Sequence, residues 1–187
     1  GCHAHVSLWD KAGKVNHFHD PKGELGISDL GYHFLGGIMH SAMSMTAITN
    51  PTVNSYKRLN APVTSSGATW SPNTVTYGGN NRTHMVRIPD EGRFEVRLAD
   101  GAVNPYLMPA VLLAAGRDGM ANKRDPGKRV DLNMYTEGHK VRGAKKLPLN
   151  MLDALREMKK SSVIKDRLGE EFMTAYQKLR GNQWLDF

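Results

Sequence analysis

The chain of 187 residues has little of several features that mark particular protein classes. Its single cysteine, Cys2, excludes an internal disulfide framework and a zinc site built from several cysteines. Its apolar runs are interrupted every few residues by Gly, His, Ser or Arg, so none predicts a membrane span. No charged segment followed by an apolar one opens the chain, so no secretion signal is visible. We therefore expect a cytoplasmic protein that does not bind a membrane.

Aromatic residues are also scarce, at 7%, and they do not alternate with basic residues as they do in proteins that stack nucleic-acid bases. The formal net charge of +7 is distributed unevenly. Residues 1–116 hold 9 Lys/Arg and 8 Asp/Glu, whereas residues 117–187 hold 16 and 10. We interpret the C-terminal excess as solvated basic helix faces, and we expect no nucleic-acid partner.

Hydrophobic periodicity predicts a mixed α+β fold. Strands are predicted at 1–9, 82–88 and 93–98. Helices are predicted at 29–49, 106–123, 150–160 and 170–180, and Ser28 is a suitable N-cap for the first of them. The segment 60–81 is rich in Ser, Thr, Gly, Asn and Pro and is predicted to be a long loop. We expect an antiparallel sheet with helices packed on one side.

Three polar side chains share one face of the first predicted strand. His3, His5 and Ser7 stand two residues apart and therefore point to the same side, opposite Cys2. Neutral imidazole is a common ligand of divalent metals. This face therefore predicts a site for one metal, or for a metal and a phosphate. Solvated histidines on an edge strand are the alternative.

A second strand presents charged side chains in the same way. Arg93, Glu95 and Arg97 share one face of the segment 93–98. A carboxylate flanked by guanidinium groups has a low pKa and stays ionised, as a hard metal requires. The arginines are bidentate donors that suit carboxylate or phosphate oxygens. The alternative is a surface ladder of ion pairs, which stabilises a fold little.

Three further arginines, Arg58, Arg82 and Arg87, could join Arg97 in an anion-binding cluster. Four unrelated surface arginines are the alternative, because spacing does not show convergence. Arg82 and Arg87 are five residues apart and would point to opposite faces of a regular strand. Sharing one site requires a bulge or an irregular start near Arg82.

Three segments resemble the catalytic domain of the glutamine synthetase family: GCHAHVSL at 1–8, NPTVNSYKRL at 50–59, and RFEVRL at 93–98 with Asp100 and NPYL at 104–107. Their order matches the family, as do Asn81-Arg82 and RIP at 87–89. The resemblance implies that residues 1–187 are the C-terminal part of a catalytic domain with a curved antiparallel sheet and packed helices. It also implies that an N-terminal β-grasp domain and early strands with most of the metal-binding glutamates are absent here. We therefore expect this chain alone to be inactive.

The reaction that the resemblance implies is the ATP-dependent ligation of glutamate to ammonia through γ-glutamyl phosphate. The implied cofactors are ATP and Mg²⁺ (or Mn²⁺), and the implied assembly is a ring-shaped homo-oligomer. Matched one by one, the family's residues place His3 and Glu95 at the metal, His5, Ser7 and Arg87 at ATP, Arg58 and Arg97 at glutamate, and Arg82 at the transferring phosphoryl group.

One departure from the family concerns the amine. The family's flap glutamate, which helps to deprotonate ammonium, has no counterpart because segment 59–89 contains no Asp or Glu. Trp70 and Tyr77 bring aromatic surface instead, as in the branch that resembles γ-glutamylmethylamide synthetase. The alternatives are therefore ligation of glutamate to a primary amine such as methylamine, or a non-catalytic relative. Tyr135 aligns with a tyrosine that some bacterial members adenylylate; an ordinary loop tyrosine is the alternative.

Overall fold

A computed structural model describes residues 1–59, 61 and 71–186. Every helix in these ranges is too short or too polar to cross a bilayer. The elements are β1 (Ala4–Val6), η1 (Glu24–Gly26), α1 (Asp29–Thr49), α2 (Ser55–Leu59), β2 (Tyr77–Gly78), β3 (Val86–Asp90), β4 (Arg93–Val96), α3 (Leu107–Ala121), η2 (Gly138–Lys140), α4 (Met151–Lys159), α5 (Ser162–Leu168) and α6 (Glu170–Leu185).

The strands form one sheet in the order β1-β4-β3-β2. β4 is antiparallel to both β1 and β3, and the β1 pairing sets His5 opposite Glu95. The predicted α+β class with packed helices is therefore confirmed. The two-residue strand β2 lies in the segment predicted to be a loop and runs parallel to β3, so the sheet is not wholly antiparallel.

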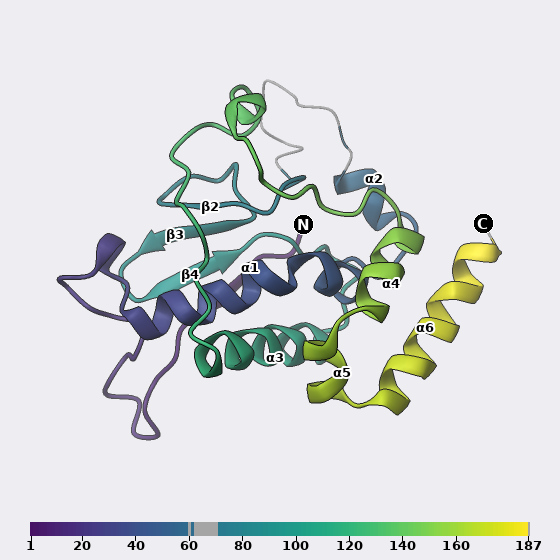
Figure 1. Ribbon diagram of the computed structural model, residues 1–187, viewed down its shortest axis with the longest axis horizontal. Helices are drawn as coiled ribbons and strands as arrows, with labels where there is room; N and C mark the ends of the chain where they lie inside the picture. The colour runs from purple at the N-terminus through teal and green to yellow at the C-terminus, as the bar shows by residue number, and fades with distance from the viewer. Residues whose placement is uncertain (60, 62–70, 187) are drawn as a thin grey trace.

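Helix α1 crosses the middle of the molecule, with the strands on one side and α3 on the other (Figure 1). Its bounds are those predicted, and the Ser28 side chain accepts a hydrogen bond from the Gly31 amide at 3.1 Å, as expected of an N-cap. The Phe34 ring of α1 packs against Phe94 of β4, with 6.1 Å between ring centroids. This contact joins the helix layer to the sheet that carries the predicted site.

Helices α1 and α3 approach each other closely because glycines face each other between them. A Cβ atom on Gly37 would lie 2.0 Å from the Ala115 carbonyl oxygen, and one on Gly119 would lie 2.2 Å from that of His33. Real Cβ atoms do not approach backbone so closely, so both positions require glycine here.

The C-terminal part of the chain forms α4 and α5, which pack against α1 and α3, and α6, which packs on α4 and α5 (Figure 1). Helix α5 lies where no helix was predicted, and α6 continues to Leu185 rather than ending at Arg180. Gly169, with φ of +90°, separates the two helices. The Tyr176 hydroxyl of α6 donates to the Ala47 carbonyl at 2.9 Å and so attaches α6 to α1.

Candidate active site

The paired strands β1 and β4 bring the two predicted metal ligands together. His3 Nδ1 lies 3.0 Å from Glu95 Oε1. The predicted alternation of β1 is confirmed, because His3, His5 and Ser7 are exposed while the residues between them are partly buried. The polar face of β1 therefore continues onto the charged face of β4.

Glu95 is buried, with 3% of its surface exposed, and is held by two guanidinium groups. Arg97 Nη1 donates to Oε1 and Arg87 Nη1 donates to Oε2, each at 2.8 Å. Burial alone would raise the pKa of Glu95, but the hydrogen bond from Arg87 and the charges of Arg97 and Arg87 outweigh it and lower the pKa. The carboxylate is therefore ionised at neutral pH.

His3 is the neutral partner in this cluster. Burial lowers its pKa, and the Arg97 charge lowers it further against the opposing effect of Glu95. A neutral imidazole beside an ionised carboxylate is a donor pair that suits a divalent cation. These two residues supply only part of a metal shell, because the described ranges contain no cluster of three or more His, Cys, Asp or Glu side chains that could hold a metal.

Arg97 has a donor to spare at this site. Its Nη1 is used by Glu95, while its Nε atom is buried and has no hydrogen-bond partner within the part of the chain that the structure describes. A buried guanidinium N–H without an acceptor is costly, and a substrate carboxylate would satisfy it. This observation fits the role at glutamate that the resemblance implies for Arg97.

Arg93 joins the site although the resemblance had assigned it no role. Its Nη1 lies 2.6 Å from His5 Nδ1, and its Nε donates to Asp90 at 3.0 Å. The sequence already indicated that Arg93 lies near the site, because its two-residue spacing from Glu95 places both side chains on one strand face. Ser7, on the same face as His5, accepts a hydrogen bond from the Trp9 indole at 2.9 Å.

Arg58 hydrogen-bonds to the backbone that follows β4. Its Nη2 donates to the carbonyl oxygens of Arg97, Leu98 and Ala99 at 3.1, 3.2 and 2.7 Å. Asn50, from the same sequence string, donates to the Leu98 carbonyl at 3.1 Å. Burial lowers the pKa of Arg58. The hydrogen bonds of Asn50 and Arg58 hold the backbone just after β4, next to Glu95 and Arg97.

Arg82 and Arg87 lie in different backbone contexts, and only Arg87 contacts Glu95. Arg82 is exposed in a turn before β3, and Asn81 closes this turn by accepting from the Thr83 amide at 3.0 Å. The irregular start expected near Arg82 is therefore present. Arg87 lies in β3 and donates from Nε to Asn80 at 2.8 Å as well as to Glu95. The structure thus brings Arg87 into the cluster and leaves Arg82 on the exposed turn.

Of the two aromatic residues expected near the amine, Tyr77 is among the described residues. Trp70 lies outside the described residues. Tyr77 is buried against Tyr32 of α1, and its hydroxyl donates to the Gly127 carbonyl at 2.9 Å, so its ring provides little exposed aromatic surface. Tyr135 is half-buried, donates to the Ser71 carbonyl at 3.1 Å, and has a pKa raised to about 12 by burial.

Comparisons with known proteins identify the family of the chain. The family described as "Glutamine synthetase, catalytic domain" matches residues 1–187. The glutamine synthetase of Rhizobium meliloti is 60% identical over 184 residues, which cover 98% of this chain and 42% of that protein. A glutamate–methylamine ligase of Methyloversatilis universalis is 40% identical over 195 residues, covering 100% of this chain and 42% of the relative.

The fold has equally similar solved relatives. A solved GmaS/ADP complex superposes with a TM-score of 0.92 at 59% identity, covering all of this chain and 42% of that one. An apo GmaS without ligand superposes with a TM-score of 0.90 at 55% identity. The chain thus spans about two fifths of the length of the relatives that it matches. Its sequence and fold place it in the glutamine synthetase family, within the catalytic domain.

Proposed function

We propose that this chain is part of a ligase that uses ATP to join glutamate to ammonia through γ-glutamyl phosphate. The observation that carries the proposal is the ionised, buried Glu95 carboxylate, which touches Arg87, Arg97 and the neutral His3. Such a cluster combines one half of a hard-metal site with several donors for phosphate and carboxylate oxygens. Both ligand classes are required by phosphoryl transfer to a carboxylate.

In this proposal His3 and Glu95 hold Mg²⁺ (or Mn²⁺) together with ligands from outside the described residues. The metal would neutralise phosphate charge during transfer. Arg87, His5 and Ser7 bind ATP, and the contact of His5 with Arg93 adds a further guanidinium to the phosphate side. The excess of arginines over carboxylates there favours a polyanionic nucleotide.

The reaction then proceeds in two balanced steps. A γ-carboxylate oxygen of glutamate attacks the terminal phosphorus of ATP, and ADP leaves. The amine nitrogen attacks the resulting acyl carbon, inorganic phosphate leaves, and the nitrogen loses a proton. Arg97 offers its unused buried Nε–H to the substrate carboxylate, while Arg58 orders the backbone of residues 97–99 and binds glutamate in the role that the family implies. Arg82 stabilises the transferring phosphoryl group from its exposed turn.

A second candidate is ligation of glutamate to a primary amine such as methylamine. It is favoured by the absence of any carboxylate in 59–89, which leaves the deprotonation of ammonium to another group or to solvent. The methyl group of methylamine adds about 0.8 kcal/mol of apolar burial, which ammonia lacks. Similarity to a named glutamate–methylamine ligase is consistent with this candidate.

The test is kcat/KM for ammonia and methylamine at equal free-base concentration, measured on the protein expressed from its complete gene. Methylamine used at least as well as ammonia would support the second candidate. A preference for ammonia of 100-fold or more, about 2.7 kcal/mol, would select glutamine synthesis. ATP hydrolysis that does not depend on glutamate would reject both candidates.

The proposal extends to the assembly and the compartment. We expect a ring-shaped homo-oligomer acting in the cytoplasm on glutamate, ATP and a small amine. Sedimentation of the complete protein and cell fractionation test these two expectations.

A further inference from the structure

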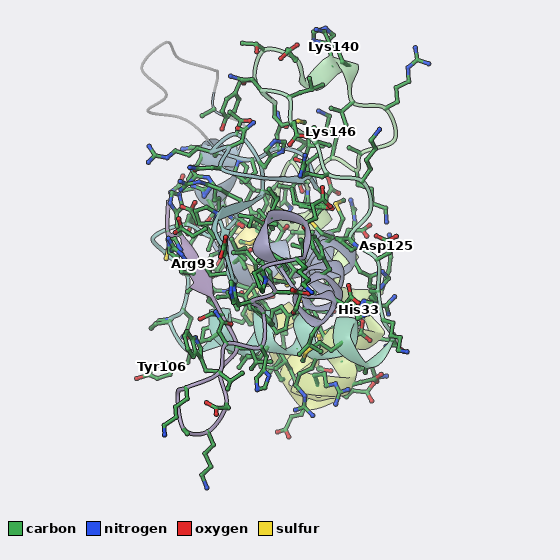
Figure 2. The ribbon with its side chains drawn as sticks, turned by 90° about the vertical axis from the view of Figure 1, so that its left-hand side faces the viewer. His33, Arg93, Tyr106, Asp125, Lys140 and Lys146 are labelled. Atoms are coloured by element: carbon green, nitrogen blue, oxygen red, sulfur yellow. The ribbon has the colours of Figure 1, made fainter. Side chains whose placement is uncertain are left out.

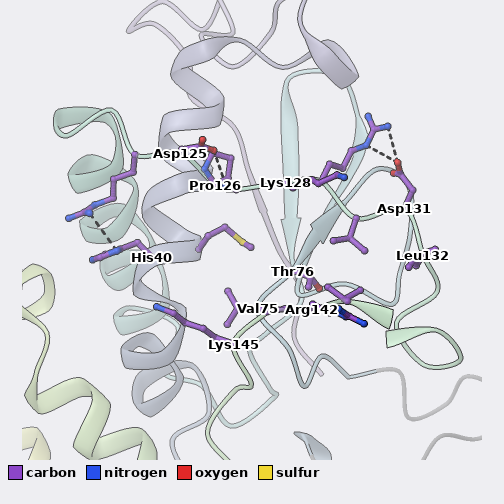
Figure 3. A pocket seen from close by; sticks show the side chains of 18 of the residues that line it. His40, Val75, Thr76, Asp125, Pro126, Lys128, Asp131, Leu132, Arg142 and Lys145 are labelled. Carbon is purple, nitrogen blue, oxygen red and sulfur yellow. Dashed lines mark hydrogen bonds and ion pairs between the residues drawn. The ribbon is translucent and has the colours of Figure 1, made fainter. Parts of the chain in front are cut away.

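A cavity of about 920 Å³ lies away from the candidate active site. It is bounded by Met39 and His40 of α1, by Val75 and Thr76, and by the segments 122–132 and 141–145 (Figure 3). Arg93 of the candidate active site and Asp125 of the cavity lie at opposite sides of the molecule (Figure 2). The cavity is therefore separate from the candidate active site.

The walls of this cavity are fixed to the rest of the fold. Tyr77 of β2 donates through its hydroxyl to the Gly127 carbonyl at 2.9 Å, and its own carbonyl accepts from the Val130 amide at 3.0 Å. The Val75 amide donates to the Lys145 carbonyl at 2.8 Å. These backbone attachments hold two loops in place around the recess, as expected of a pre-formed ligand site.

The lining is strongly cationic. It contains five Lys or Arg side chains and two Asp side chains. Two of the arginines have acidic partners, since Arg124 pairs with Asp118, and Arg129 pairs with Glu24 at 2.7 Å and Asp131 at 2.9 Å. The other three cations have no ion pair with any described residue: Lys128, Arg142 and Lys145.

Two further observations suit a ligand that carries negative charge. Burial lowers the pKa of His40, and the nearby charges of Arg124 and Lys145 lower it further against the opposing effect of Asp118. Met39, Val75 and Leu132 also contribute to the lining and provide apolar surface. Apolar surface with a few convergent charged groups is typical of small-molecule sites, and about 920 Å³ is within their usual size.

We propose that this cavity binds a small polyanion that carries two or more carboxylate or phosphate groups. Lys128, Arg142 and Lys145 would contact the anionic groups, and the apolar side chains would contact its carbon skeleton. The cavity wall is also connected to the turn that carries Arg82. The Leu132 carbonyl accepts a hydrogen bond from Nδ2 of Asn81, the residue before Arg82, at 3.0 Å. A ligand here would therefore act on the turn that carries Arg82.

The test uses titration calorimetry on the complete protein with two probes, metal-free pyrophosphate and succinate. The pocket variant is Lys128→Ala/Arg142→Ala/Lys145→Ala. A matched control, Lys11→Ala/Lys159→Ala/Lys178→Ala, removes the same charge from exposed positions outside the cavity. ADP binding is measured in the same samples, so that loss of the proposed nucleotide site is recognised separately.

We expect at least one probe to bind the unmodified protein, and to bind the pocket variant at least tenfold more weakly, while the control variant changes its affinity less than twofold. Binding of pyrophosphate alone would show that the cavity prefers phosphate groups, and binding of succinate alone would show that it prefers carboxylates. Three results would overturn the proposal: no binding of either probe, equal weakening in both variants, or unchanged binding by the pocket variant.

Discussion

His3 and Glu95 approach each other diagonally across the β1–β4 pair, with Nδ1 of the histidine 3.0 Å from Oε1 of the carboxylate. If both bind one metal, His3→Ala in the complete protein should weaken Mg²⁺-dependent ADP binding by about 10- to 100-fold. His17→Ala, at an exposed position outside this cluster, is the control. Calorimetry with and without Mg²⁺ measures the effect, and equal ADP affinity in both variants would reject a shared metal.

Arg58 has a structural task that can be separated from substrate binding. Arg58→Ala leaves three carbonyl oxygens of residues 97–99 without their guanidinium donor, and we expect it to lower the free energy of unfolding by about 2–3 kcal/mol. Urea unfolding measures this loss. The exposed neighbour Lys57→Ala should change stability by less than about 0.5 kcal/mol. An unfolding midpoint for Arg58→Ala equal to that of Lys57→Ala would show that these bonds do not stabilise the fold.

The close packing of α1 on α3 predicts opposite results for the same substitution at two glycines. Gly37→Ala places a methyl group 2.0 Å from the Ala115 carbonyl oxygen. We expect it to lower the free energy of unfolding by about 1–3 kcal/mol. Gly181→Ala in α6 meets no atom within 4 Å and should raise helix stability by up to about 1 kcal/mol. Thermal unfolding of both variants decides this, and a stabilised Gly37→Ala variant would contradict the packing.

The buried His84 predicts a pH effect on stability. Burial lowers its pKa below the ordinary 6.5, and its Nδ1 lies 3.0 Å from the Thr76 hydroxyl. The unfolded state therefore binds more protons than the folded state below about pH 6.5, and the stability present above that pH is lost as the pH falls toward the folded pKa.

His84→Gln removes this titration. We expect the urea midpoint of the unmodified protein to fall more steeply than that of His84→Gln between pH 7 and pH 5. His139→Gln, at an exposed position, should behave as the unmodified protein does. Parallel pH curves for His84→Gln and the unmodified protein would show that His84 does not titrate in this range.

Much of the fold could be predicted from local patterns. The period of α1 and its Ser28 cap gave the correct bounds, and the alternation of residues 1–8 gave the correct faces of β1. Helix α5 was missed because seven residues with only two buried ones carry a weak periodic signal. Strand β2 was missed because a two-residue pairing depends on its neighbour in the sheet and not on its own sequence.

The site could be predicted in part for a similar reason. Same-face spacing on one strand identified Glu95 with Arg97, and His3 with His5. Spacing could not show that β1 and β4 are paired, since this is a long-range contact, nor that Arg58 is turned toward backbone carbonyls. The role of Arg93 was visible on its strand face but became specific only through the contact with His5.

The most direct test of the proposed chemistry is phosphate release from ATP that depends on both glutamate and an amine. It should be measured on the complete protein, on Glu95→Gln, and on Glu91→Gln, whose side chain is exposed in the turn before β4. We predict that phosphate and γ-glutamyl amide form in equal amounts in the unmodified protein and in Glu91→Gln, and at least about 100-fold more slowly in Glu95→Gln. Equal rates in Glu95→Gln and the unmodified protein would contradict the assignment of this carboxylate to the reaction.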